Sequence, residues 1–260
     1  MIRTFLIIAA AGLVLTVVCL GGAFALGGRE LAANGWAWTV FDSDGDSVRF
    51  ERVHNSDGRD DGPEITRTLA WDGSDSLVMN FGGDVEYVQG DTASVTVTGP
   101  QSLVERVQVL EGRIDLKDGE DDVYLNWRGG RVHAWSSSDR LKVVVTAPDV
   151  TRFEVNGSGH MDIRAYDHEE MDLGVSGSGE IAAAGRTRAL TLDISGSGEV
   201  DLDALELADA DVTVSGSGEA RLGPTGQVSV AISGSGDVTL TERPQSLDSR
   251  VSGSGKIRQP

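Results

Sequence analysis

A short motif, Ser-Gly-Ser-Gly, recurs at nearly constant spacing through the second half of the chain. It occurs six times, the first time as Asn-Gly-Ser-Gly, and its first glycines are 20, 19, 20, 18 and 19 residues apart. The motif glycines are Gly157, Gly159, Gly177, Gly179, Gly196, Gly198, Gly216, Gly218, Gly234, Gly236, Gly253 and Gly255. A repeat of this period is typical of a solenoid, in which each coil stacks on the previous one.

The residues around each motif alternate between apolar and polar, as they do in β-strands with one buried face. In the second copy, for example, Val175 lies just before the motif and Ile181 lies just after it. The last copy breaks the pattern, because Ser249 and Gln259 occupy positions that are apolar in the other copies. Each coil is therefore predicted to consist of a strand, a Gly-Ser corner and a second strand.

An identical turn at a constant spacing favours a parallel solenoid over a meander of antiparallel hairpins. Coils that stack at about 4.8 Å place each corner over the previous one, so the same tight turn must recur. Glycine supplies a positive φ and a close backbone approach, and serine hydroxyls are expected to satisfy polar groups of the corner. We therefore predict an all-β fold, a right-handed parallel β-solenoid with rungs of about 19 residues.

The chain before the motifs shows strand patterns without the repeat. Strands are predicted at 66–71, 77–81, 85–89, 94–98, 104–110, 123–127 and 141–146. Terminal repeats of a solenoid are often degenerate. We therefore predict one domain over residues 66–260, with irregular coils over 66–150 and regular rungs over 151–260. Residues 31–65 are predicted to be a juxtamembrane linker, because their second half is rich in Asp, Gly and Ser.

Residues 5–26 form an uncharged apolar run of 22 residues within the N-terminal segment 1–30. As a helix with a rise of about 1.5 Å per residue, this run would span a hydrocarbon layer of about 30 Å. Two interpretations are open: a single-pass anchor in the cytoplasmic membrane, or a signal helix that is cleaved near Ala25. Both place the remainder of the chain on the extracytoplasmic side of the cell envelope.

The charge of the chain excludes one class of partner. The 260 residues include 41 Asp and Glu against 22 Lys and Arg, which gives a formal net charge of −19. Nucleic-acid binding needs clustered cations, so it is not expected here. The single cysteine, Cys19, lies inside the apolar run, so no disulfide is expected within the chain.

The sequence also resembles a known family. The run from Leu141 to Gly159, LKVVVTAPDVTRFEVNGSG, is followed by Ser-Gly-Ser-Gly rungs with an acidic residue after the motif. This pattern is similar to the head GIN domain family of auto-transporter adhesins, a bacterial envelope family, over roughly residues 66–260. The resemblance implies a β-solenoid in an exported or membrane-targeted setting, and it brings no catalytic residues with it.

No catalytic site or cofactor is predicted from the motifs. None of the Gly-Ser-Gly copies fits a G-x-S-x-G elbow between a strand and a helix. A structural corner is needed at every rung, whereas a catalytic serine is needed once. The four histidines show no spacing typical of a metal site.

One polar row carries a sharper hypothesis. The residue after the motif is acidic in four consecutive copies, namely Glu180, Glu199, Glu219 and Asp237. At about 4.8 Å, two like charges repel by about 0.9 kcal/mol in water and by about 3.5 kcal/mol at an effective dielectric of 20. Either these side chains turn into solvent, or they form a cation stripe that binds calcium between rungs.

These observations favour a non-enzymatic envelope protein that displays a rigid β-solenoid for adhesion, scaffolding or the binding of a glycan or a protein. Its expected contact with the membrane runs through residues 5–26. The alternatives are a polysaccharide-active β-helix enzyme and a calcium-responsive envelope module. Neither the ligand nor the oligomeric state follows from the sequence.

Overall fold

The computed structural model describes residues 37–41, 47–51, 63–117, 123–128, 131–136 and 138–260, and it divides the chain into two units. The smaller unit contains a four-stranded sheet in the order β1-β2-β9-β10. Its strands are β1 (Ala37–Phe41), β2 (Ser47–Glu51), β9 (Val123–Arg128) and β10 (Arg131–Ser136). β1 and β2 pair as antiparallel strands, and β9 joins β2 in parallel.

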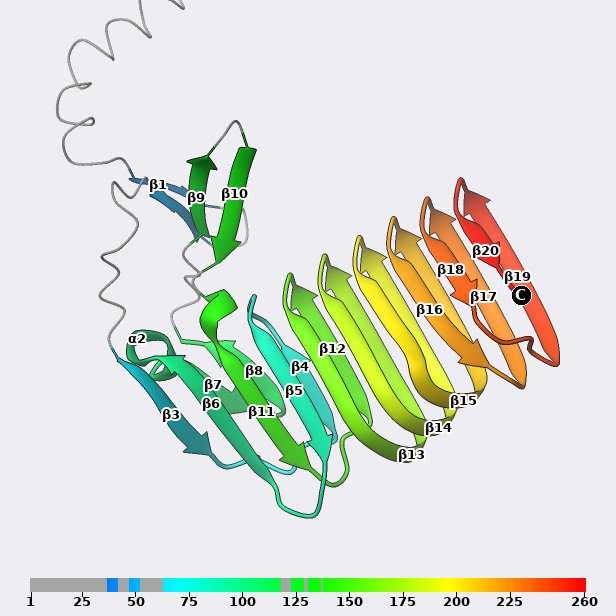
Figure 1. Cartoon of the computed structure of the whole chain (residues 1–260), viewed down its shortest axis with the longest axis horizontal. Coiled ribbons are helices and arrows are strands. Elements are labelled where there is room, and N and C mark those ends of the chain that lie inside the picture. The colour runs from blue at the N-terminus through cyan, green and yellow to red at the C-terminus, as the bar shows by residue number, and fades with distance from the viewer. Residues whose placement is uncertain (1–36, 42–46, 52–62, 118–122, 129–130, 137) are drawn as a thin grey trace, which may run out of the picture. The chain divides into compact units, whose positions relative to one another are not determined.

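The larger unit contains the regular coils, drawn from green to red in Figure 1. In each of its first full coils one long strand runs down the front, bends, and returns up the back to the next Gly-Ser corner. We call the strands after each corner the front sheet and the strands before each corner the back sheet. The elements are β12 (Arg152–Gly157), β13 (His160–Gly177), β14 (Glu180–Gly196), β15 (Glu199–Gly216), β16 (Glu219–Pro224), β17 (Gln227–Gly234), β18 (Asp237–Leu240), β19 (Ser246–Gly253) and β20 (Lys256–Arg258).

Successive coils pair in parallel and in a constant register around every corner. Gly157 pairs with Gly177, and the same partnership continues through the other first glycines of the motif. The apolar residue before the motif faces inward in each of the first five copies, where it is fully or almost fully buried. These residues are Val155, Val175, Ile194, Val214 and Ile232. The predicted all-β solenoid and its alternating core are confirmed.

The strands before the regular coils are arranged differently. They are β3 (Glu64–Leu69), β4 (Ser76–Met79), β5 (Asp84–Gln89), β6 (Ser94–Pro100), β7 (Val107–Leu110), β8 (Arg113–Leu116) and β11 (Lys142–Ala147), with the short helices α2 (Gln101–Val104) and η1 (Ser138–Arg140). β4 and β5 extend the back and front sheets in parallel. However, β6 is antiparallel to both β3 and β11, and β7 is antiparallel to β8.

This arrangement corrects the expectation that 66–150 forms a series of irregular coils. β4 and β5 follow the path of a coil, and β8 and β11 pair with them in parallel, whereas β6 is antiparallel to β3 and β11 and β7 is antiparallel to β8. β7 and β8 form a hairpin through the turn at Glu111 and Gly112, whereas β6 pairs with β3 and β11 across long stretches of sequence. These strands lack the repeated Gly-Ser corner that holds the later coils in one parallel register. Two stretches also depart from the predicted domain boundaries: the linker 31–65 contains β1 and β2, and the predicted strand 123–127 pairs with β2 as part of β9.

The last coil lies at the end of the core. β19 and β20 each pair with one neighbouring strand among the described residues. Val251, at a position that is buried in earlier coils, is 43 % exposed, and Ser249 is exposed as well. The polar Ser249 therefore occupies a position that the other copies bury and this coil does not.

Among the residues that the structure describes, none of the helices has the length and hydropathy of a membrane span. Residues 5–26, and with them the cleavage position near Ala25, lie outside the described residues. The choice between an anchor and a cleaved signal stays a prediction.

Candidate interaction surfaces

The Gly-Ser corners form one edge of the solenoid, and their glycines are required by the stacking. The first glycine of each motif has a φ between +109° and +131°, a conformation that L-residues avoid. A Cβ on Gly177 would lie 2.7 Å from the carbonyl oxygen of Gly157 in the coil below. A Cβ on the second glycine, Gly179, would lie 2.5 Å from Cγ1 of Val155. The corner glycines therefore set the close approach of the coils.

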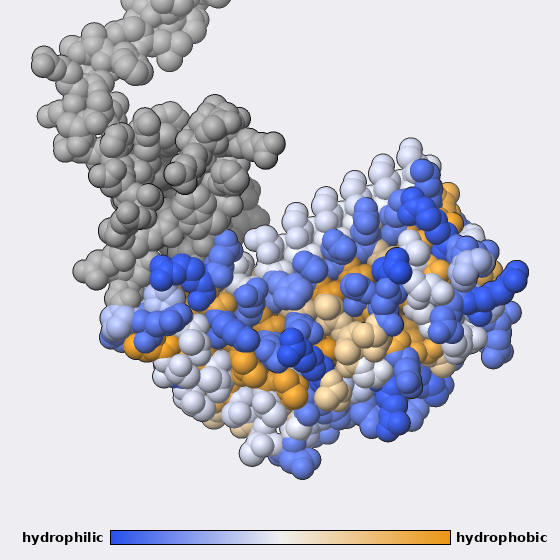
Figure 2. Space-filling view, in the orientation of Figure 1, coloured by the Kyte–Doolittle hydropathy of each residue, from blue (hydrophilic) through white to orange (hydrophobic). Residues whose placement is uncertain are grey.

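Backbone groups of neighbouring corners satisfy one another. The amide of Ser178 donates to Gly157 O at 2.8 Å, and the amide of Ser197 donates to Gly177 O at 2.7 Å. No corner serine hydroxyl forms a side-chain hydrogen bond with another described residue, in contrast to the expectation from the sequence. The pale corners along the upper edge in Figure 2 therefore present free hydroxyl groups to solvent.

The front sheet carries the acidic row in register. Glu180 pairs with Glu199, which pairs with Glu219, and Asp237 follows on β18. The row continues through His160 to Asp84 on β5 and ends at Lys256 on β20. The sequence did not reveal Asp84 as a member, because β5 lacks the motif.

Two members of the acidic row have a histidine or an arginine nearby. Nδ1 of His160 lies 3.4 Å from Oε2 of Glu180, and Nη2 of Arg258 lies 2.8 Å from Oδ2 of Asp237. Across the described part of the chain, no three His, Cys, Asp or Glu side chains are grouped so as to hold a metal ion. Calcium binding between rungs stays a prediction.

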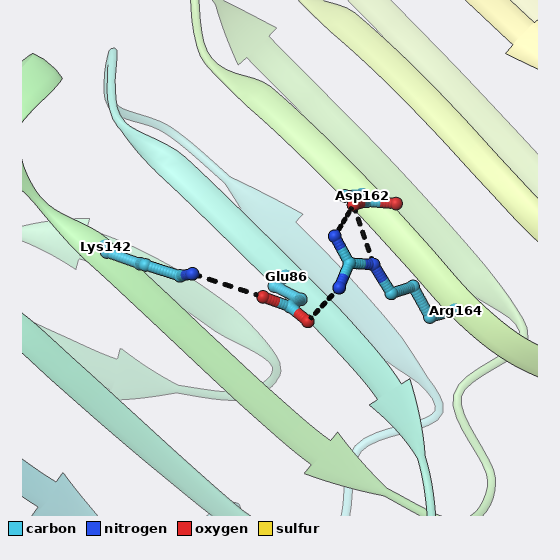
Figure 3. Close-up of polar contacts among 4 residues, drawn as sticks. All are labelled: Glu86, Lys142, Asp162 and Arg164. Atoms are coloured by element: carbon cyan, nitrogen blue, oxygen red, sulfur yellow. Dashed lines mark hydrogen bonds and ion pairs between the residues drawn. The ribbon is translucent and has the colours of Figure 1, made fainter.

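An ion network joins the irregular strands to the first regular coil (Figure 3). Glu86 on β5 accepts contacts from Lys142 of β11 at 3.4 Å and from Arg164 of β13 at 2.9 Å. Arg164 also contacts Asp162 at 2.5 Å, and this hydrogen bond raises the pKa of the guanidinium. Only 19 % of the Glu86 side chain is exposed, so this carboxylate is more shielded from solvent than its partners. No repeat signal in the sequence links these strands.

A column of aromatic rings lies in the core at the same junction. The ring of Phe153 is 4.9 Å from that of Tyr87 and 5.9 Å from that of Tyr166, in edge-to-face geometry. The hydroxyl of Tyr87 donates to Ala147 O at 2.8 Å. Burial raises the pKa of Tyr87 to about 12. This column packs Tyr87 of β5 against Phe153 of β12, which packs in turn against Tyr166 of β13, and it thereby stabilises the junction.

At the opposite corner of the coils, a depression of about 520 Å³ is lined by charged side chains. Arg186 forms two hydrogen bonds of 2.6 Å with the carboxylate of Asp167, and it thereby lowers the pKa of that carboxyl. Arg188 contacts Glu169 at 2.9 Å. Both arginines thus pair with acids of the preceding coil, which links the coils along this corner.

Comparison with known proteins assigns the chain to a family. The sequence profile of the family described as "Putative auto-transporter adhesin, head GIN domain" matches residues 75–259. That range includes all six motifs and nearly all of both sheets. The chain belongs to this family. The resemblance identified from the sequence is confirmed.

Solved structures share the fold of this chain. A crystal structure of a putative adhesin from Bacteroides fragilis NCTC 9343 is 15% identical, with a TM-score of 0.52 over 76% of this chain and 97% of that chain. A crystal structure of a "Putative lipid binding protein" from Parabacteroides distasonis ATCC 8503 is 17% identical, with a TM-score of 0.56 over 76% and 97%. At these identities the likeness establishes the fold alone. A search of curated proteins finds no match.

Proposed function

We propose that this head GIN protein is a non-enzymatic adhesion module of the bacterial envelope, in which the solenoid is a rigid display surface. The observation that carries the proposal is the register of the outward rows. The acidic row and the corner serines repeat from coil to coil at a spacing of about 4.8 Å. Such a surface suits a partner that is itself repetitive, such as a polysaccharide.

The solenoid also has the rigidity that this role requires. Its core is continuous through the coils, and every corner is tied to the next by backbone hydrogen bonds. A preformed surface of this kind loses little conformational entropy on binding, so weak contacts that repeat along it add up. The adhesin descriptions of the family and of the Bacteroides fragilis structure support the same role.

The proposed setting is the extracytoplasmic side of the envelope. Residues 5–26 would tether the chain to the cytoplasmic membrane or be removed near Ala25 during export. The coils are proposed to wind in the right-handed sense that parallel crossovers favour.

The experiment is a binding and turnover assay on the full-length chain, purified in detergent if it is retained in the membrane. A panel of cell-wall and capsular polysaccharides and whole bacterial cells serves as the set of partners, and the polysaccharides are sized before and after incubation. Binding without shortening supports adhesion. Shortening of any polysaccharide would identify the enzyme alternative, and failure to bind both the panel and the cells would contradict adhesion.

A further inference from the structure

The outer face of the back sheet contains a depression of about 350 Å³ that spans β12, β13 and β14. Gly174 lies among its lining residues. Its neighbours Leu173 and Val175 are buried, so the position of Gly174 faces outward. In the register of the coils, Gly174 lies between Glu154 and Asp193. The missing side chain leaves a gap between two carboxylates, which we call the Gly174 trough.

Polar side chains of three coils surround the Gly174 trough. They are Arg152, Glu154, Asp172, Ser176, Thr191, Asp193 and Ser195. Arg152 and Asp172 form an ion pair at 3.4 Å. The other five form no side-chain hydrogen bond or ion pair with any described residue. Their hydrogen-bonding groups are therefore available to a ligand.

These groups are chemically mixed, and the mixture restricts the class of ligand. The hydroxyls of Ser176, Thr191 and Ser195 both donate and accept hydrogen bonds, carboxylates accept them, and a guanidinium donates them. An anion needs donors alone and a cation needs acceptors alone, whereas the hydroxyl groups of a sugar need both. The coil spacing of about 4.8 Å is also close to the length of one sugar residue in an extended chain.

We propose that the Gly174 trough is a subsite for a neutral polysaccharide that lies across β12, β13 and β14. Glu154 and Asp193 accept hydrogen bonds from hydroxyls of one sugar residue, and the gap at Gly174 lets the ring approach the backbone. Ser176, Thr191 and Ser195 contact the adjoining residues of the polymer. This inference rests on the proposed adhesion function and assigns it a site and a ligand class.

The substitution Gly174→Gln fills the trough without a clash against the backbone. Gly174 does not adopt a positive φ, and a Cβ there would lie 3.3 Å from Cγ of Glu154, a flexible side chain that can move. Gly223→Gln is the matched control on the front sheet. It too lies outside the positive-φ region, and its added Cβ would lie 3.0 Å from Oγ1 of Thr241. Circular dichroism and thermal melting verify that both variants fold.

Binding is measured by the retardation of the full-length chain in gels that contain dextran, yeast mannan, a β-1,3-glucan or xylan. Alginate and polylysine serve as anionic and cationic comparisons. At least one neutral polymer is expected to retard the wild-type chain. Gly174→Gln is expected to weaken that binding about tenfold or more, and Gly223→Gln to change it less than about twofold. Glu154→Gln with Asp193→Asn is expected to weaken it as well.

Three outcomes would overturn the inference. Retardation by alginate or polylysine alone would show that the ligand is charged. An equal effect of the two glycine variants, or no effect of Gly174→Gln, would place neutral-polymer binding elsewhere and leave the adhesion function standing. If no polymer retards the chain but whole cells still bind it, the trough assignment fails while the adhesion function does not.

Discussion

The regular coils and the strands that precede them share two sheets but are held together in different ways. In the coils, one corner recurs six times, and glycine backbones approach each other more closely than any Cβ would allow. At the junction with the preceding strands, the aromatic column and the Glu86 network depend on particular side chains. The regular coils are thus held together by repeated backbone contacts, whereas their junction with the irregular strands is held together by contacts between particular side chains.

The largest effect is expected at the junction of the two regions. Phe153→Ala removes a fully buried ring from between Tyr87 and Tyr166, and it should lower the free energy of unfolding by about 4 kcal/mol. Urea unfolding followed by circular dichroism measures the change. Phe153→Leu keeps most of the volume and should cost less than half as much. Equal costs would show that the ring contacts are not specific.

The stability of a corner in the middle of the coils should depend on close contact with the backbone of the preceding coil as well as on the positive φ of its glycine. A Cβ on Gly216 would overlap the carbonyl oxygen of Gly196, whereas a Cβ on Gly157 would have nothing within 4 Å. Both residues have a positive φ. Gly216→Ala is therefore expected to destabilise the fold by about 3 kcal/mol, and Gly157→Ala by about 1 kcal/mol. Equal losses in thermal unfolding would contradict the role of backbone contact.

Because of the buried Tyr87 in the aromatic column, the fold is expected to lose stability at alkaline pH. Burial raises the pKa of Tyr87 to about 12 from its usual value of 10, so the folded state holds a proton that the unfolded state releases first. The stabilisation is complete below about pH 10 and is lost as the pH rises towards 12. Tyr87→Phe should reduce this dependence and cost about 1 kcal/mol at pH 7, because the bond to Ala147 O is lost. An unchanged pH profile of urea unfolding would contradict this assignment.

The ion network should contribute less than the aromatic column. Glu86→Gln is expected to destabilise the fold by about 1 kcal/mol, because it leaves Lys142 and Arg164 without their shared carboxylate. Glu169→Gln is the matched control, since that side chain is 82% exposed and pairs with a single arginine. Its cost should stay below about 0.5 kcal/mol. If Glu169→Gln destabilised the fold as much as Glu86→Gln, the shielding of Glu86 from solvent would not strengthen the network.

The smallest effect is expected at the acidic row. Calcium at millimolar concentration should change the melting temperature by less than about 2 °C, because exposed carboxylates are screened by water and salt. The measurement is differential scanning calorimetry with and without calcium. A larger rise in the melting temperature that disappears in the double variant Glu199→Gln, Glu219→Gln would instead establish the cation stripe. The same variant without calcium reports the repulsion within the row.

The repeat in the sequence predicts the fold of the regular half of the molecule. The motif spacing established that coils stack, and the alternation around each motif established which residues face the core. Together they predict that Glu180 and Glu199 lie in one row, as the pairing of β14 with β15 confirms. These features could be predicted because each coil interacts mainly with its neighbour, so one local rule, applied repeatedly, specifies the whole stack.

Pairings between strands that are distant in the sequence lie outside what the repeat encodes. β11 pairs with both β5 and β6, although about fifty residues separate it from either strand. The Glu86 network and the gap at Gly174 depend on which strands pair with one another. The repeating pattern of apolar and polar residues does not specify which outward position has a gap. Such contacts depend on long-range complementarity of single side chains, which a repeating pattern of apolar and polar residues does not specify.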